Sequence, residues 1–136
     1  MDPAAPPWLE GLDHLLSRWQ AMIDLLARSA GMPYAMINRL APDCLMVQTL
    51  NSGAEGFEPL QRIDLQANTY CSHVLRSGQP LRVEDARLLP EMHDNPSTLF
   101  GLVYYHGLPI READGSLFGT ICMLDFVPRQ PDENTL

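Results

Sequence analysis

The hydrophobic positions between residues 8 and 30 follow the spacing of an amphipathic helix. One row of apolar residues recurs at steps of three and four, and consists of Leu9, Leu12, Leu16, Trp19, Ile23 and Leu26. A second row beside it consists of Leu15, Met22 and Leu25. The pattern predicts a helix that ends at Gly31, before Met32-Pro33. Two interpretations of this wide apolar surface stay open: one broad stripe facing the core, or one row on the domain and the other on a partner helix.

Shorter patterns follow, and they change from helical spacing to alternation. Two strands are predicted over 34–40 and 44–52, with a Pro/Asp turn between them, and 60–65 predicts a weaker third strand. The stretch "NTYCSHVLRSGQP" predicts a short helix, with Asn68 or Thr69 as its N-cap and Gly78 at its end. Residues 81–86 predict a short extended piece, and 87–100 a short helix or turn over one edge of the domain.

A hairpin is predicted over residues 101–126, because Asp114-Gly115 is a strong signal for a tight turn between strands. Neither of its strands has a clean polar face. Since a strand that is apolar on both sides is normally covered twice, we expect the helix at 8–30 on one side and the segment 53–100 on the other. Helices that are gathered rather than alternating with the strands predict an α+β domain with an antiparallel sheet.

The covering segment 53–100 also predicts a cavity, because loops and short helices seldom seal a sheet face completely. Tyr104, Tyr105 and His106 add polar ends to an otherwise apolar wall, and that mixture is typical of a small-molecule site. An alternative stays open for each of the three residues, namely a core position with satisfied hydrogen bonds.

The composition and net charge exclude several classes of function. The chain has 136 residues, which suits one domain, and its formal net charge of −8 argues against binding nucleic acid through a broad basic patch. Its three cysteines, Cys44, Cys71 and Cys122, form no CxxC pair, so neither a zinc site nor a disulfide scaffold is indicated. The opening residues lack the features of a signal peptide, and no apolar run approaches the ~18 residues of a membrane span. We therefore expect a cytoplasmic protein without membrane insertion.

Three segments of the chain carry a family resemblance, namely "LARSAGMPYAMINRL", "NTYCSHVLRSGQPLRVEDA" and "VYYHGLPIREADGSLFGTICMLDFVPR". Together they resemble the GAF domain family, in the style of the modules that precede bacterial diguanylate cyclases and sensor histidine kinases. The most specific signature is formed by Gly107, Pro109, Ile110, Asp114, Gly115, Gly119, Thr120, Cys122, Leu124 and Asp125. The resemblance covers roughly residues 20–129.

The resemblance implies a central antiparallel sheet of about five to six strands, with terminal helices on one face and loops and short helices roofing a pocket on the other. It divides the chain into a flexible leader (1–7), a packing and dimerisation helix (8–30), a sensor core (31–128) and the start of a linker to an output domain (129–136). Family members are mostly regulatory, and their ligands vary widely. The ligand, and whether any is bound, is therefore left open.

The expected pocket residues are Tyr70, Cys71, His73, Asp85, Tyr104 and His106. Only one face of the hairpin can line the pocket, so Tyr104 and His106 are excluded if that face carries Tyr105. Cys71 lies in the first turn of a predicted helix, where the helix dipole favours a thiolate. The alternative is a small buried residue packed under that helix.

The resemblance also suggests two forms of cysteine chemistry. Covalent bilin attachment is not expected, because Ser72 follows Cys71 where bilin-binding relatives commonly have histidine. Free methionine sulfoxide reductases of the family carry a closely spaced cysteine pair that is absent here. A reductase would need Cys71 to meet Cys44 or Cys122, which come from distant segments.

The chain lacks any catalytic motif of its own, so we expect a non-enzymatic part of a larger signalling protein. The leading hypothesis is a bacterial sensor module that binds a small molecule, forms a homodimer through residues 8–30, and controls a downstream diguanylate cyclase or histidine kinase. The alternatives are a cysteine-dependent reductase and a ligand-free dimerisation module. No cofactor or metal is assigned.

Overall fold

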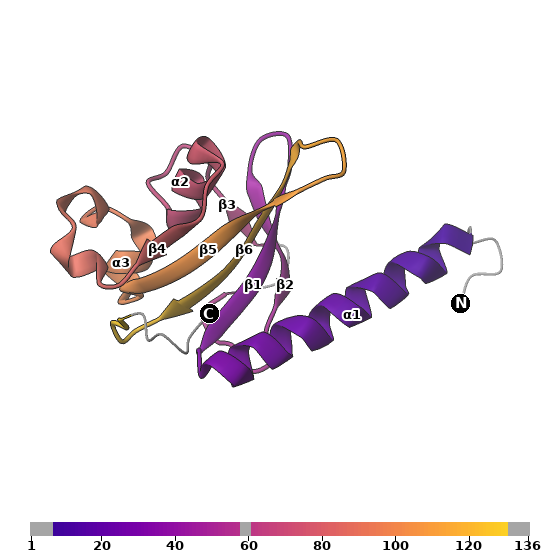
Figure 1. Ribbon diagram of the computed structural model, residues 1–136, viewed down its shortest axis with the longest axis horizontal. Coiled ribbons are helices and arrows are strands. Elements are labelled where there is room, and N and C mark those ends of the chain that lie inside the picture. The colour runs from indigo at the N-terminus through magenta and orange to yellow at the C-terminus, as the bar shows by residue number, and fades with distance from the viewer. Residues whose placement is uncertain (1–6, 58–60, 131–136) are drawn as a thin grey trace.

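The computed structural model describes residues 7–57 and 61–130, with side chains from residue 14 onward (Figure 1). Its elements are α1 (Pro7–Ala30), β1 (Tyr34–Leu40), β2 (Leu45–Leu50), β3 (Arg62–Ile63), α2 (Tyr70–Ser77), β4 (Leu81–Val83), the 3₁₀ turns η1 (Ala86–Leu88) and η2 (Pro90–Met92), α3 (Pro96–Phe100), β5 (Tyr104–Arg111) and β6 (Leu117–Asp125). The predicted leader (1–7) and linker (129–136) lie almost wholly outside the described residues.

The strands form one six-stranded antiparallel sheet in the order β3-β2-β1-β6-β5-β4. The hairpin β5–β6 turns at Asp114-Gly115, where Gly115 has φ 89° and Asp114 accepts a hydrogen bond from the backbone N–H of Ser116. The prediction of an α+β domain built on such a sheet is confirmed. The weakest predicted strand shrinks to the two-residue edge strand β3.

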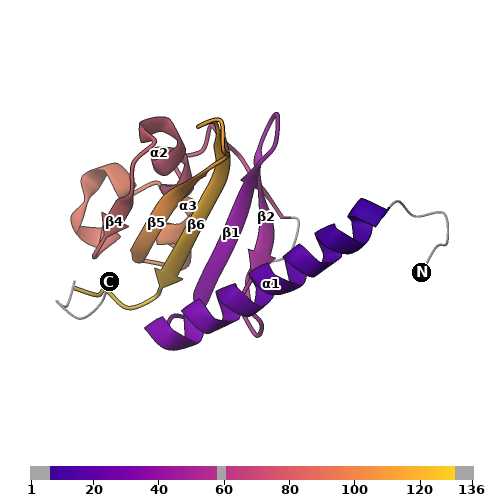
Figure 2. The same cartoon turned by 45° about the vertical axis from the view of Figure 1, so that its right-hand side comes forward.

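Helix α1 packs on one face of the sheet, over β1 and β2 (Figures 1 and 2). Ile23 and Ala27 form a small core with Ala35 and Ile37 of β1. The N-terminal part of the helix extends past the sheet. The expectation that α1 covers the final hairpin needs correction: the helix crosses the other end of the sheet, and of the hairpin it mainly reaches β6.

The two apolar rows of α1 have different surroundings. Ile23 of the first row is fully buried, whereas Leu15, Met22 and Leu25 of the second row are 43%, 48% and 58% exposed. The interpretation of a single core-facing stripe is therefore wrong for the described part of the helix. An unpartnered apolar row remains on its outer side.

The opposite face of the sheet is covered by α2 and by the segment around η1, η2 and α3 (Figure 1). Helix α2 starts at the N-cap Thr69, whose side chain accepts a hydrogen bond from the backbone N–H of Ser72, and ends at Gly78 with φ 68°. Both caps are among those expected from the sequence. The capped helix seats Tyr70, Cys71 and Val74 on the sheet.

Arg129 ties the end of β6 to the end of α1. Its guanidinium donates to Asp125 at 2.7 Å, to the carbonyl of Ala30 at 2.9 Å and to that of Gly31 at 2.6 Å. These carbonyls lie at the C-terminal end of the helix and directly after it, where a cation is favoured. The ends of two distant segments are thus joined by one side chain.

Candidate functional site

A partly enclosed cavity of about 260 Å³ lies on the sheet face opposite α1. Its inner wall is formed by Met36, Asn38, Tyr70, Cys71, Tyr105, Cys122 and Leu124, and its rim by residues around Phe57, Ile63 and Ser97. Two larger depressions, of about 530 and 410 Å³, lie along α1. Only the smaller cavity is lined by the buried thiol and amide groups described below, so we take it as the candidate site. We call it the hollow.

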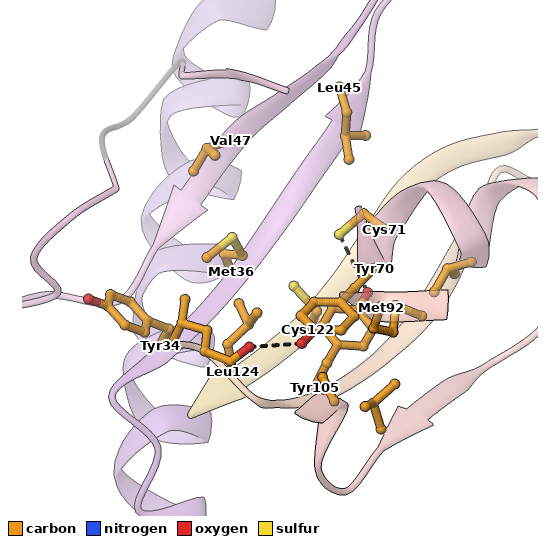
Figure 3. Packing of buried hydrophobic residues seen from close by; sticks show 14 residues of the cluster. Tyr34, Met36, Leu45, Val47, Tyr70, Cys71, Met92, Tyr105, Cys122 and Leu124 are labelled. Carbon is orange, nitrogen blue, oxygen red and sulfur yellow. Dashed lines mark hydrogen bonds between the residues drawn. The ribbon is translucent and has the colours of Figure 1, made fainter. Parts of the chain in front are cut away.

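The two cysteines of the hollow come from separate elements (Figure 3). Cys71 lies in the first turn of α2, and Cys122 lies in β6, opposite Gly107 of β5 and Met36 of β1. Both are buried free thiols. The docking of α2 onto the sheet places them face to face. The meeting of Cys71 with Cys122, which the sequence left open, therefore takes place, whereas Cys44 is not part of the hollow's lining.

Three hydrogen-bond donors converge on the sulfur of Cys71. The side-chain amide of Asn38 lies 3.5 Å from it, the hydroxyl of Thr120 lies 3.5 Å from it, and the hydroxyl of Tyr105 lies 3.4 Å from it. The same amide of Asn38 lies 3.8 Å from the sulfur of Cys122. One amide group thus bridges both thiols, and each of these contacts stabilises negative charge on sulfur.

The thiols differ in acidity because they share one hydrogen bond. Donation from Cys122, aided by Thr120, Tyr105 and Asn38 and opposed by burial, lowers the pKa of Cys71 to about 7. The bond to the neighbouring Cys71 sulfur, together with burial, raises the pKa of Cys122 well above its usual value. Burial, with the charge on Cys71, likewise raises the pKa of Tyr105, so this hydroxyl keeps its proton. Cys71 is therefore the more acidic thiol of the pair, and Cys122 keeps its proton to higher pH.

Asn38 is fully buried and only partly satisfied. Its amide nitrogen donates to the Thr120 hydroxyl at 3.2 Å, but its carbonyl oxygen has no hydrogen-bond partner within the described part of the chain. A buried amide oxygen without a partner costs free energy. Asn38 lines the hollow, so a molecule bound there could donate the missing hydrogen bond.

Two glycines make this packing possible. A side chain at Gly107 would overlap the Tyr105 hydroxyl, and a side chain at Gly119 would overlap the backbone carbonyl of Asn38. Tyr105 also stacks on Tyr70 with ring centroids 4.7 Å apart, and Tyr70 donates to the carbonyl of Leu102 at 2.8 Å. The aromatic wall of the hollow is thus rigid and internally hydrogen-bonded.

Among the expected pocket residues, Tyr70 and Cys71 line the hollow, but Tyr104 and His106 do not. Side chains alternate along β5, so Tyr105 faces the hollow and its two neighbours face the other side of the sheet. The assignment of Tyr104 and His106 is therefore corrected. Burial, with the nearby charge of Arg82, lowers the pKa of His106.

His73 and Asp85 also lie elsewhere. The ring of His73 is 2.6 Å from the side-chain oxygen of Asn68, on the side of α2 that faces away from the thiols. Asp85 caps η1 and forms an ion pair with Arg87 at 2.7 Å, so its carboxylate is already used. Asn38 and Thr120, which line or contact the hollow's thiols, were not among the residues expected from the sequence. The alternation around Gly119-Thr120-Ile121-Cys122 could have placed Thr120 and Cys122 on one face.

Solved structures share this fold. They include a type II free methionine-R-sulfoxide reductase from Thermoplasma acidophilum (15% identity, TM-score 0.70, covering 89% of this chain and 81% of that chain). A putative GAF sensor protein from Burkholderia vietnamiensis matches with 19% identity and TM-score 0.70, covering 88% and 71%. The GAF region of a putative membrane protein from Geobacter sulfurreducens matches with 15% identity and TM-score 0.74, covering 94% and 87%. At such identities the likeness shows the fold alone.

The sequence comparison is more specific. Curated proteins yield no match to this chain. The family model of the GAF domain, however, matches residues 14–136, which is nearly the whole length. The chain therefore belongs to the GAF domain family.

Proposed function

We propose that this GAF domain is a bacterial regulatory module that binds a small molecule in the hollow and controls a downstream diguanylate cyclase or histidine kinase. The single observation that carries the ligand proposal is the buried carbonyl oxygen of Asn38, which lacks a partner among the described residues and belongs to the hollow's lining. A ligand that donates a hydrogen bond there would relieve an unfavourable burial. The surrounding wall is mainly apolar, so the ligand combines a small apolar body with at least one donor group.

Transmission to an output domain would run through the ends of the domain. Arg129 links the exit of β6, which carries Cys122, to the last turn of α1. A ligand that favours one packing of β6 would therefore favour one position of α1. The exposed row of Leu15, Met22 and Leu25 suits a homodimer in which this helix meets its copy.

No helix within the described residues has the length and apolarity to cross a membrane. We propose that the module is cytoplasmic because it has three buried free thiols, which a reducing compartment preserves.

The test of the ligand proposal is to fill the hollow and measure binding. Ile63, on the rim, is replaced by Trp, and binding of small metabolites is followed by chemical shifts of the ¹⁵N-labelled protein. A compound that shifts the amides of Asn38 and Cys71 in the parent should lose its effect in Ile63→Trp. The matched control is Leu108→Trp, which places the same bulk on an exposed residue of β5 that does not line the hollow. Equal binding by both variants would contradict the proposal.

A second function is favoured by a specific observation, the meeting of Cys71 with Cys122. We propose as the alternative a cysteine-dependent reductase that acts on a small oxidised molecule such as free methionine sulfoxide. The lowered pKa of Cys71 favours the nucleophilic thiolate, and the neighbouring Cys122 thiol would be the partner for a disulfide. Thiol-dependent turnover of free methionine sulfoxide, lost in Cys71→Ser, would support this function. A parent protein without turnover would remove it.

A further inference from the structure

The two thiols of the hollow have the arrangement of a redox pair rather than of two core residues. Their sulfurs are bridged by the amide of Asn38, whose nitrogen lies 3.5 Å from the sulfur of Cys71 and 3.8 Å from that of Cys122. Pure packing of cysteine does not require three donors aimed at one sulfur. Here Asn38, Thr120 and Tyr105 all point at Cys71, and together they would hold a thiolate inside an apolar core.

The geometry points to a peroxide-sensing site: Cys71 and Cys122 form a reversible disulfide across the hollow when the domain meets a small hydroperoxide such as hydrogen peroxide. This inference concerns the same cavity as the proposed function, but it requires no ligand and no turnover of methionine sulfoxide.

The chemistry balances in two steps. The thiolate of Cys71 attacks one oxygen of hydrogen peroxide, the O–O bond breaks, and the departing hydroxide takes a proton from a neighbouring donor and leaves as water. Cys71 is then a sulfenic acid. The sulfur of Cys122 then attacks the Cys71 sulfur and the S–O bond breaks. The departing hydroxide takes the proton that Cys122 gives up and leaves as a second water. The net reaction converts two thiols and one peroxide into one disulfide and two waters.

The surroundings supply the groups that these steps need. The Tyr105 hydroxyl, 3.4 Å from the Cys71 sulfur, stays protonated and can donate to the departing oxygen. Cys122 keeps its thiol proton until the sulfenic acid has formed, so it is Cys71 that attacks the peroxide first. The hollow of about 260 Å³ holds hydrogen peroxide easily, but Cys71 and Cys122 are only 7% and 2% exposed. Access is thus restricted to small oxidants.

The disulfide would alter the hollow itself. Bond formation draws α2 toward β6 and removes the thiolate that Asn38, Thr120 and Tyr105 hold. A peroxide signal would then reach the same strand that Arg129 ties to α1. The hollow would accept two inputs, one by binding and one by oxidation.

The experiment treats the reduced protein with equimolar hydrogen peroxide, alkylates the remaining thiols, and maps peptides by mass spectrometry. We expect an intramolecular bond between Cys71 and Cys122, a mass lower by two hydrogen atoms, a free Cys44, and full recovery with dithiothreitol. Cumene hydroperoxide, which is bulky, should react at least ~10-fold more slowly, because both sulfurs are buried.

Two variants sharpen the assignment. Cys122→Ser should stop at a sulfenic acid on Cys71 that dimedone traps, and Cys44→Ser, the matched control at another buried cysteine, should behave as the parent. A peroxide-treated parent that keeps three free thiols, forms sulfinic acid at once, or links Cys44 instead would overturn the inference. Because these outcomes are read on the parent protein, they do not depend on whether a variant folds. It leaves the ligand proposal untouched, since shifts of Asn38 on binding are measured on reduced protein.

Discussion

The two faces of the sheet are built differently, and the difference separates a supporting surface from a reactive one. The α1 face is covered by a single helix over β1 and β2 and keeps partly exposed apolar residues. On this face the rings of Trp19 and Phe118 pack edge to face, with their centroids 5.8 Å apart. The opposite face is covered by several short segments and encloses polar groups that converge on one sulfur. One long helix covers a sheet face with apolar contacts alone. Several short segments leave a cavity between them, and polar side chains can be positioned in it.

The largest expected effect comes from removing the close contact between β1 and β6 that both faces share. Gly119→Ala places a methyl group onto the backbone carbonyl of Asn38. Backbone atoms cannot move aside without breaking the strand pair, so we expect a loss of at least ~3 kcal/mol in the free energy of unfolding. Urea denaturation followed by circular dichroism measures it. The matched comparison is Gly107→Ala, whose clash falls on a side chain, the Tyr105 hydroxyl, and should cost less.

A smaller effect is expected where the end of β6 is tied to the end of α1. Arg129→Ala removes hydrogen bonds to Asp125 and to two carbonyls at the end of α1, and we expect a loss of about 1–3 kcal/mol. The control is Arg62→Ala, whose ion pair with Asp43 is largely exposed and should change stability by less than ~1 kcal/mol. Thermal and urea unfolding measure both variants. Equal losses of stability in Arg129→Ala and Arg62→Ala would show that Arg129 does not hold β6 to α1.

The third expected effect is on the acidity of the Cys71 thiol, whose pKa its hydrogen-bond partners in the hollow lower. With a pKa of about 7, Cys71 is mostly protonated at pH 6 and mostly thiolate at pH 8. Its alkylation rate should therefore rise about tenfold per pH unit below pH 7 and level off above it. The groups facing it are Cys122 on β6 and Tyr105 on β5, and the charged residues of the lining are Arg62 and Asp64.

Tyr105→Phe tests the cause of that acidity. Loss of the hydroxyl removes one donor to the thiolate, so the midpoint of the alkylation profile should move to higher pH. Phe preserves the stacking on Tyr70, which separates the electrostatic effect from packing. A midpoint that stays in place would mean that the hydroxyl does not stabilise the thiolate.

The smallest effect on stability, and the clearest on assembly, is expected on the outer side of α1. Leu15→Glu or Leu25→Glu should leave the melting temperature nearly unchanged, because both side chains are exposed, yet should lower the mass measured by light scattering from dimer toward monomer. Leu88→Glu, at an exposed leucine of η1 distant from α1, is the control. A parent that is monomeric at micromolar concentration would remove the dimer proposal.

Sequence alone determined much of this protein, because the deciding signals are local. The spacing in α1, the caps Thr69 and Gly78, and the turn at Asp114-Gly115 are set by residues a few positions apart. The apolar character of both faces of the final hairpin likewise predicted a twice-covered sheet and a pocket. Those features sufficed for the fold class, whereas the family followed from the resemblance of three segments to the GAF domain, which the family model confirms.

Only the tertiary structure decided which face of β5 points into the hollow and which residues meet there. That choice depends on strand register, since a shift by one residue exchanges Tyr105 for Tyr104 and His106. Cys71 and Cys122 are 51 residues apart, and Asn38 precedes them both, so no local pattern joins them. They meet because α2 docks on β5 and β6, and because β1, which carries Asn38, is the sheet neighbour of β6. The chemistry of the hollow therefore belongs to the packing of distant segments rather than to any motif.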